Sequence, residues 1–290
     1  MEKMLEKPSW LRKGLPIGAV TQRMEEDFMK RGLHTICQEA CCPNMGECFS
    51  KGVATFLIMG SVCTRNCRFC AVASGRPETL DPTEPERLAG KVNELALRFV
   101  VITSVTRDDL SDGGASHFVR VIEAVRRKCP GVGIEVLVPD FKGSRPALST
   151  VIHALPEVLN HNVETVPRLY PSVRPQADYS QSVELLKRAK DINKSTITKS
   201  GLMVGLGETT GEVMHVMDDL RDVDCDILTI GQYLQPSADH YPVIEYVNPD
   251  KFEFYRDEAQ RKGFKGVASS PFVRSSYRAG ELFEQVSSLY

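Results

Sequence analysis

The sequence predicts an α/β fold built around a parallel β-sheet. Six short apolar runs that are typical of buried strands alternate along the chain with amphipathic segments of helical spacing. Right-handed crossovers place each helix outside the sheet, so this alternation predicts that neighbouring strands are parallel. The chain has 290 residues and a hydrophobic fraction of 42%. This suits one large enzyme domain with extensions, because α/β barrels often reach roughly 200 to 250 residues.

The first half of the predicted fold contains three strands and three helices. The strands are nearly continuous apolar runs bounded by polar or glycine residues, and we expect them over residues 55–60, 97–105 and 133–140. The helices carry apolar residues every three or four positions, as at Leu88, Val92 and Leu95. We expect these helices over residues 84–97, 115–128 and 147–154.

The second half repeats the pattern. We expect strands over residues 158–165, 196–207 with its loop, and 225–233, and helices over 182–192, 212–223 and 249–262. A last short strand covers 266–270, and a terminal helix begins near Gly280. Ser275 and Ser276 precede this helix, so a serine N-cap is one interpretation of the pair.

Three cysteines directly follow the first predicted strand. Cys63, Cys67 and Cys70 have the spacing C-x3-C-x2-C, which can hold three irons of a [4Fe-4S] cluster and leave the fourth open. Four cysteines normally close such a cluster for electron transfer. The missing ligand therefore suggests that a small molecule binds and reacts at the open iron. The alternative is a loop that is merely rich in cysteine.

A second cysteine group lies upstream, so that seven of the nine cysteines fall within residues 37–70. An odd number of cysteines and no signal peptide favour a reducing compartment and bound metal over disulfides. Zinc is a rival, but Cys37, Cys42 and Cys48 lack the usual close cysteine pairs of zinc sites. Their spacing suits a loop around one cluster. Cys41 is interpreted as a bystander, and Cys129 and Cys225 as small buried hydrophobic residues.

Other candidate site residues follow the predicted strands, because active sites of α/β barrels gather at the carboxyl ends of strands. They are Gly113 and Gly114 after the second strand, Asn162 and Glu164 on the fourth, Lys199 and Gly205 around the fifth, and Gln232 and Tyr233 ending the sixth. The glycines would allow close backbone approach to a ligand. A simple turn at the glycine pair and a structural hydrogen-bond network at the Asn-Glu pair are the alternatives.

Charge and hydropathy exclude some classes of protein. The formal net charge is −2, so the chain carries no overall basic field that would attract nucleic acid or an anionic membrane. The apolar runs are far shorter than the roughly 20 residues that span a bilayer. The amino terminus lacks the core of a signal peptide. We therefore expect a cytoplasmic protein without nucleic-acid or membrane partners.

The cysteine triplet Cys63, Cys67 and Cys70 is similar to the signature of the radical S-adenosylmethionine (SAM) enzymes. Together with the upstream cysteines and residues 274–277, Arg-Ser-Ser-Tyr, it resembles the lipoyl synthase family. The likeness extends through residues 7–12, 54–58, 107–114, 161–168 and 205–209, and so covers nearly the whole chain.

This resemblance implies a partial (β/α)6 barrel of the TIM type rather than a doubly wound sheet. It implies an N-terminal extension over 1–52 with auxiliary cluster cysteines and a radical SAM barrel over 53–262. A C-terminal extension over 263–290 would carry the Arg-Ser-Ser-Tyr motif.

The resemblance also implies site residues. Cys63, Cys67 and Cys70 would bind a [4Fe-4S] cluster that SAM completes. Cys37, Cys42 and Cys48 would bind an auxiliary [4Fe-4S] cluster with Ser276, or alternatively Ser275, as its fourth ligand. The candidates for contact with SAM are Gly113, Gly114, Asn162, Glu164, Lys199 and Gly205.

The implied activity is that of a sulfurtransferase. It inserts two sulfur atoms, at C6 and C8 of a protein-bound N6-octanoyl-lysine, with the auxiliary cluster as sulfur donor and two SAM per product. The implied partners are an octanoylated lipoyl carrier protein, either a dehydrogenase E2 lipoyl domain or a glycine-cleavage H protein, and an electron donor such as ferredoxin or flavodoxin. Alternatives are another radical SAM enzyme, such as a methylthiotransferase or a peptide-modifying maturase, and a non-catalytic iron-sulfur carrier.

Overall fold

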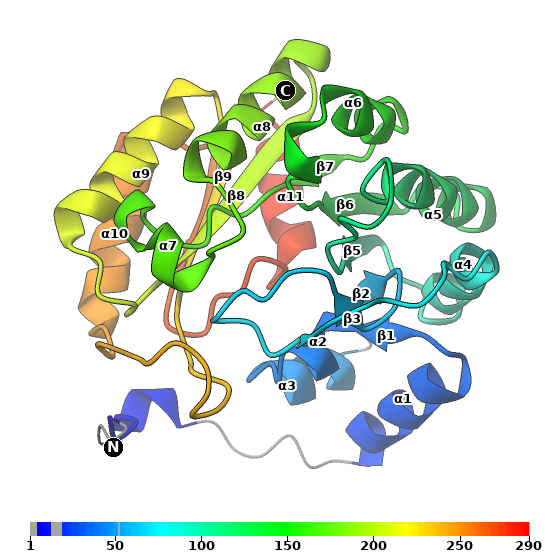
Figure 1. The fold of residues 1–290 in the computed structure, drawn as a ribbon, viewed down its shortest axis with the longest axis horizontal. Coiled ribbons are helices and arrows are strands. Elements are labelled where there is room, and N and C mark those ends of the chain that lie inside the picture. The colour runs from blue at the N-terminus through cyan, green and yellow to red at the C-terminus, as the bar shows by residue number, and fades with distance from the viewer. Residues whose placement is uncertain (1–4, 13–18, 52, 290) are drawn as a thin grey trace. The chain divides into compact units, whose positions relative to one another are not determined.

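The computed structural model describes residues 5–12, 19–51 and 53–289 (Figure 1). The chain forms two compact units. The first unit comprises Gly14–Asn66 and Ala71–Leu159, and the second comprises Met1–Lys13, Cys67–Cys70 and Asn160–Tyr290. Among the described helices, none is long and apolar enough to cross a membrane.

The first unit contains a mostly parallel sheet with the strand order β1-β2-β5-β6-β7. Its strands are β1 (His34–Thr35), β2 (Thr55–Ile58), β5 (Phe99–Ser104), β6 (Gly133–Leu137) and β7 (Val158–Asn160). The last residue of β7, Asn160, belongs to the second unit. A separate pair of short strands is formed by β3 (Val62–Cys63) and β4 (Ala73–Ser74). β1 is antiparallel to β2, whereas β2, β5 and β6 are parallel. Phe56 lies opposite Ile102, which lies opposite Val136, and all three are fully buried.

Helices pack around this sheet because each carries an apolar stripe. The helices of the first unit are α1 (Ala19–Lys30), α2 (Ile36–Glu39), α3 (Met45–Ser50), α4 (Glu84–Glu94), α5 (Ala115–Lys128) and α6 (Arg145–His153), with the 3-10 turn η2 (Phe141–Gly143). Neighbouring helices α4, α5 and α6 flank β2, β5 and β6 in sequence order (Figure 1). Such right-handed strand and helix repeats leave the carboxyl ends of the strands free to carry a site.

An aromatic cluster anchors the segment with the upstream cysteines. Phe28 of α1 lies 5.8 Å from both Phe49 of α3 and Phe56 of β2, measured between ring centroids. All three rings are buried, with at most 1% exposure. Burial of such side chains stabilises a fold by roughly 1.5–3 kcal/mol each. This cluster fixes α3, and with it Cys48, against the first parallel strand.

The second unit contains three parallel strands in the order β8-β9-β10. The strands are β8 (Ile197–Val204), β9 (Ile227–Gln232) and β10 (Gly266–Ser269). The helices of this unit are α7 (Tyr170–Val173), α8 (Tyr179–Ile192), α9 (Thr210–Asp222), α10 (Pro249–Arg261) and α11 (Ala279–Ser287). It also contains the 3-10 turns η1 (Ser9–Leu11) and η3 (Pro167–Leu169). Helix α10 packs against β9 and β10, and α11 packs against β10. The predicted alternation of strands and helices is confirmed in both units.

Three local predictions are wrong. The predicted strand over 158–165 ends at Asn160, and Glu164, which has a left-handed φ of 65°, forms an isolated parallel bridge with Leu202. The predicted cysteine loop contains the short helices α2 and α3, and Thr35 caps α2 by accepting a hydrogen bond from the Gln38 N–H. The serine cap is wrong because Arg278 is the N-cap of α11 and its side chain makes no capping bond.

Other short or N-terminal elements were not predicted from the sequence, namely α1, β1, β3, β4, α7 and the 3-10 turns. The predicted domain boundaries after residues 52 and 262 stay predictions. Residues 1–4, 13–18 and 52 of the predicted N-terminal extension lie outside the described residues.

Candidate functional site

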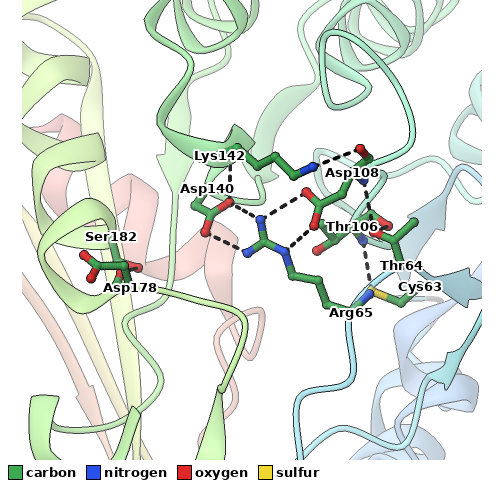
Figure 2. A network of polar contacts seen from close by, with 9 residues as sticks. All are labelled: Cys63, Thr64, Arg65, Thr106, Asp108, Asp140, Lys142, Asp178 and Ser182. Carbon is green, nitrogen blue, oxygen red and sulfur yellow. Dashed lines mark hydrogen bonds and ion pairs between the residues drawn. The ribbon is translucent and has the colours of Figure 1, made fainter. Parts of the chain in front are cut away.

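Cys63 lies just beyond the first parallel strand, at the end of β3. Its sulfur accepts hydrogen bonds from the backbone N–H groups of Arg65 and Thr106, with nitrogen to sulfur distances of 3.4 and 3.3 Å (Figure 2). Hydrogen bonds to cluster sulfurs stabilise the thiolate and tune the reduction potential. Cys63 therefore has surroundings that fit an iron-sulfur ligand.

Cys67 and Cys70 form a tight turn in the second unit. The Cys70 N–H donates to the Cys67 carbonyl at 3.0 Å, and the Cys70 carbonyl faces His240 Nε2 at 3.0 Å. Arg68, between the two cysteines, donates its N–H to the Val173 carbonyl and accepts from the Tyr241 N–H. The backbone around both thiols is therefore fixed by hydrogen bonds on either side, while both side chains remain partly exposed.

Cys37, Cys42 and Cys48 share one electrostatic environment in the first unit. Burial raises the pKa of the Cys37 thiol to about 12, the Thr55 backbone opposes this shift, and the thiols of Cys42 and Cys48 reinforce it. The three thiols are therefore close enough to influence one another. A bound metal would have to displace the Cys37 proton, as is usual for cysteine ligands.

The spacing of the donor groups bears on the zinc alternative. Within residues 5–12, 19–51 and 53–289, no three His, Cys, Asp or Glu side chains converge closely enough to hold a single metal ion. A structural zinc site gathers four ligands around one ion, whereas a [4Fe-4S] cube binds each thiolate at a separate iron. The cluster assignment of Cys37, Cys42 and Cys48 stays a prediction. Cys41 is exposed and has a left-handed φ of 48°.

The two serines of the Arg-Ser-Ser-Tyr motif differ in their contacts. The Ser275 hydroxyl donates to Asn162 Oδ1 at 3.0 Å and accepts from Asn160 Nδ2 at 2.7 Å. Over the described part of the chain, no hydrogen bond involves the Ser276 hydroxyl. Ser275 is thus held by the polar end of β7, and Ser276 is available for another ligand.

Asn162 and Glu164 contact one another although the strand ends before them. Asn162 Nδ2 donates to Glu164 Oε1 at 3.1 Å. Burial raises the pKa of Glu164, and the nearby positive charge of Arg174 and the hydrogen bond from Asn162 oppose this shift. Lys199, on the adjacent strand β8, is fully buried. A partly buried carboxylate with a raised pKa is typical of functional sites but also occurs in structural networks.

The predicted glycines are all in left-handed conformations that favour glycine. Gly114 has a φ of 88°, and a Cβ atom there would lie 2.3 Å from the Met59 sulfur. Gly205 has a φ of 99°, and its Cβ would lie 2.2 Å from Gln232 Nε2. Gln232 also donates to the Glu245 carbonyl at 2.9 Å, so it connects β9 to the following segment. Both glycines thus allow close packing within the protein. Their contact with SAM stays a prediction.

Sequence reasoning did not find the polar residues around Cys63. Arg65, Thr106, Asp108 and Asp140 surround the cysteine loop from three separate segments (Figure 2). The available signal was positional, since Asp108 follows the predicted strand 97–105 and Asp140 ends the predicted strand 133–140. Cys129 and Cys225, in contrast, are buried as predicted.

The fold and the cysteine triplet after its first parallel strand define a radical SAM protein. Residues 57–220, more than half of the chain, match the family model described as the radical SAM superfamily. The solved structure of methylornithine synthase (PylB) is similar with a TM-score of 0.57 and 16% identity, covering 72% of this chain and 61% of that one. HydG, a maturase of the [FeFe]-hydrogenase, has a TM-score of 0.59 and 16% identity over 73% of this chain and 50% of its own.

At these identities the two structures establish the fold alone, and they confirm the predicted α/β partial barrel of the TIM type.

The curated relatives identify the family within the radical SAM superfamily. The lipoyl synthase of Caldanaerobacter subterraneus subsp. tengcongensis is 57% identical over 275 residues, which cover 95% of this chain and 96% of the relative. That of Caldicellulosiruptor saccharolyticus is 55% identical over 276 residues, covering 95% and 97%. The chain belongs to the lipoyl synthase family of the radical SAM superfamily. Its cofactors are iron-sulfur clusters and SAM, and the methylthiotransferase and non-catalytic carrier alternatives are rejected.

Proposed function

We propose that this chain inserts sulfur at C6 and C8 of an octanoyl group that is amide-linked to a lysine of a lipoyl carrier protein. The observation that carries the proposal is the presence of two separate cysteine triplets on one radical SAM chain. The C6–H and C8–H bonds of the substrate are unactivated, so no side-chain acid or base can deprotonate them at neutral pH. Chemistry of this kind requires removal of a hydrogen atom and a separate source of sulfur.

The first triplet would generate the radical. Cys63, Cys67 and Cys70 would hold a [4Fe-4S] cluster, which with bound SAM supplies a 5′-deoxyadenosyl radical able to abstract hydrogen. The N–H groups that point at the Cys63 sulfur support this assignment. Candidate contacts to SAM are Gly113, Gly114, Asn162, Glu164, Lys199 and Gly205. The protein would position the reactants and exclude water.

The second triplet would hold the sulfur source. Cys37, Cys42 and Cys48 would bind an auxiliary [4Fe-4S] cluster with Ser276 as the fourth ligand. The Ser276 hydroxyl has no hydrogen-bond partner among the described residues, whereas Asn160 and Asn162 hold Ser275, which favours Ser276. A hard oxygen ligand binds a soft iron-sulfur cluster less firmly than thiolate. Such a ligand would suit a cluster that gives up sulfur.

The partners follow from the substrate and the redox chemistry. The carrier would be a dehydrogenase E2 lipoyl domain or a glycine-cleavage H protein, and a ferredoxin or flavodoxin would supply electrons. Free cysteines that bind iron suit a reducing compartment, and we place the reaction in the cytoplasm.

The proposal is tested by Cys42→Ala in anaerobic single-turnover assays with an octanoylated carrier domain. We expect the variant to retain reductive cleavage of SAM and to form no thiolated product, because only the sulfur source is damaged. Cys41→Ala is the matched control, since Cys41 is exposed and adjacent, and we expect it to retain both activities. Lipoyl product formed by Cys42→Ala would show that the assignment of the sulfur donor is wrong.

A further inference from the structure

Arg65 lies inside the first cysteine triplet and is buried, with 7% exposure. A buried guanidinium requires charged or hydrogen-bonding partners, because desolvation of an unpaired charge is costly. Arg65 has two such partners. Its Nε and Nη2 atoms donate to Asp108 at 2.7 and 3.1 Å, and its Nη1 and Nη2 atoms both donate to Asp140 at 2.7 Å (Figure 2).

The two carboxylates come from the carboxyl ends of neighbouring strands. Asp108 follows β5, and Asp140 follows β6, which pairs with β5 in parallel. Asp140 is 2% exposed and also accepts the Lys142 N–H at 3.0 Å. Arg65 therefore joins the cysteine loop to the ends of two strands within the first unit. Paired N–H bonds of this kind use the planar fork that arginine has and lysine lacks.

A second set of contacts holds the neighbouring residue. The Thr64 hydroxyl donates to the Thr106 carbonyl at 2.9 Å and accepts from the Asp108 N–H at 3.0 Å. The segment 106–108 thus holds both Thr64 and Arg65. The same two segments supply the N–H groups that point at the Cys63 sulfur, from Arg65 at 3.4 Å and from Thr106 at 3.3 Å.

Charged groups lie around this loop. Two carboxylates bind one guanidinium, and the Lys142 ammonium binds the Asp108 carbonyl at 3.1 Å from an exposed position where solvent screens it. The charge of the two carboxylates therefore lies on the loop segments that surround Cys63. Nearby charge and hydrogen bonds to the sulfurs set the potential of an iron-sulfur cluster.

We propose that Arg65 is a positioning residue that, with Asp108 and Asp140, fixes the N–H groups on the Cys63 sulfur and sets the charge beside it. The inference rests on the proposed function, because it takes Cys63 to be a cluster ligand. The clamp is defined here as Arg65, Asp108 and Asp140. It acts on the cluster through the loop and through its net charge, without contact with iron.

Two variants separate the two effects of the clamp. Arg65→Lys keeps the positive charge but cannot pair with both carboxylates, so we expect amide hydrogen exchange at residues 63–65 of the apoprotein to rise about tenfold or more. Asp140→Asn keeps the size of the side chain, removes one negative charge and leaves one of the two oxygens that accept from Arg65, so we expect a more positive midpoint potential with iron content retained. The potential is read by EPR on the full-length reconstituted protein, following the signal that SAM perturbs.

Two control variants separate the effects of the clamp from general effects of substitution. Arg126→Lys alters a half-exposed ion pair with Glu157 in the same unit, and we expect it to change neither measurement. Asp108→Asn leaves the more buried Asp140 pair in place, so it serves if Asp140→Asn does not fold, and it should shift the potential in the same direction. Unchanged exchange in Arg65→Lys together with an unchanged potential in the folded Asp-to-Asn variant would overturn the inference. A wild-type protein that neither cleaves SAM nor changes its EPR signal with SAM would instead overturn the proposed function.

Discussion

Two adjacent serines have different contacts, and this difference distinguishes their roles. Ser275 is held by Asn160 and Asn162, while the Ser276 hydroxyl makes no hydrogen bond within the described chain. A hydroxyl that already donates and accepts would have to lose both contacts to bind iron, at a cost of about 1 kcal/mol or more for each. This cost favours our proposal that Ser276 is the ligand.

We therefore predict opposite results for the two alanine variants. Ser276→Ala should abolish lipoyl product while SAM cleavage continues, because the auxiliary cluster loses its oxygen ligand. Ser275→Ala should retain product formation and lose about 1–2 kcal/mol of unfolding free energy from two hydrogen bonds. Anaerobic product assays and urea unfolding measure these effects. Loss of product in Ser275→Ala alone would assign the ligand to Ser275 instead.

At the scale of residues, the sequence predicts candidate cysteine ligands more readily than the residues that contact them. Spacing predicts the six cluster cysteines, because the members of each triplet lie close together in the chain. Arg65 has partners 43 and 75 residues away, which only the pairing of β5 with β6 brings together. Long-range contacts of this kind have no local pattern, so the clamp could not be predicted.

At the scale of elements, the start of α9 shows how a loop is held after a strand. Glu208 accepts N–H bonds from Gly205 and Leu206 at 2.6 and 2.9 Å, which closes the turn after β8. The helix then begins with a capping box, in which Thr209 and Glu212 bind each other's backbone N–H groups. The glycine pattern here therefore serves a turn and a helix start, and no phosphate-binding loop is required to explain it.

The capping box gives a pH-dependent prediction. Two hydrogen bonds from Arg168, followed by the Thr209 N–H, lower the pKa of Glu212 to about 2 from its ordinary 4.5. A lowered native pKa stabilises the fold above the unfolded pKa, and this stabilisation is lost as the pH falls from about 4.5 toward 2. Glu212→Gln should cost about 1 kcal/mol at pH 7 and progressively less in acid.

Urea unfolding of the wild type and of Glu212→Gln at several pH values measures this difference. Arg168 is 54% exposed, so added salt should also reduce the difference in unfolding free energy between the two proteins. Glu184→Gln is a suitable control, because Glu184 forms an ordinary i,i+4 pair with Arg188 on α8, which contributes a few tenths of a kcal/mol. If the difference in unfolding free energy between the wild type and Glu212→Gln does not change with pH, the charge of the Glu212 carboxylate does not cause it.

Most elements follow from local patterns, and the exceptions have physical causes. The helix over 115–128 is confirmed at both ends, because its apolar stripe and its starting glycine are visible in the sequence. β7 ends at Asn160 and the backbone has a left-handed φ at Glu164, although Val163 and Val166 nearby are apolar and buried. β1 has two residues and is defined by its pairing with β2, so no periodicity could reveal it. A strand as short as β1 depends on its partner strand, which a local sequence pattern does not show.

At the scale of the whole molecule, two cysteine triplets imply two clusters on one chain. Each triplet has its own local environment: backbone N–H groups donate to the Cys63 sulfur, whereas Cys37 is buried near Cys42 and Cys48. Because the proposed roles differ, each cluster should be removable without the other. Family membership alone does not decide which residues hold which cluster.

The iron content tests this division directly. We predict about eight irons per chain in the anaerobically reconstituted wild type, and about four in each triple alanine variant, one at Cys63, Cys67 and Cys70 and the other at Cys37, Cys42 and Cys48. SAM should perturb the EPR signal only where the first triplet is intact, because only that cluster has an iron open to a small molecule. Cys41→Ala should retain about eight irons, since Cys41 is exposed and is not assigned to a cluster. A wild-type value near four would contradict the two-cluster assignment, and a SAM-dependent signal in the variant without Cys63, Cys67 and Cys70 would reverse the roles of the two triplets.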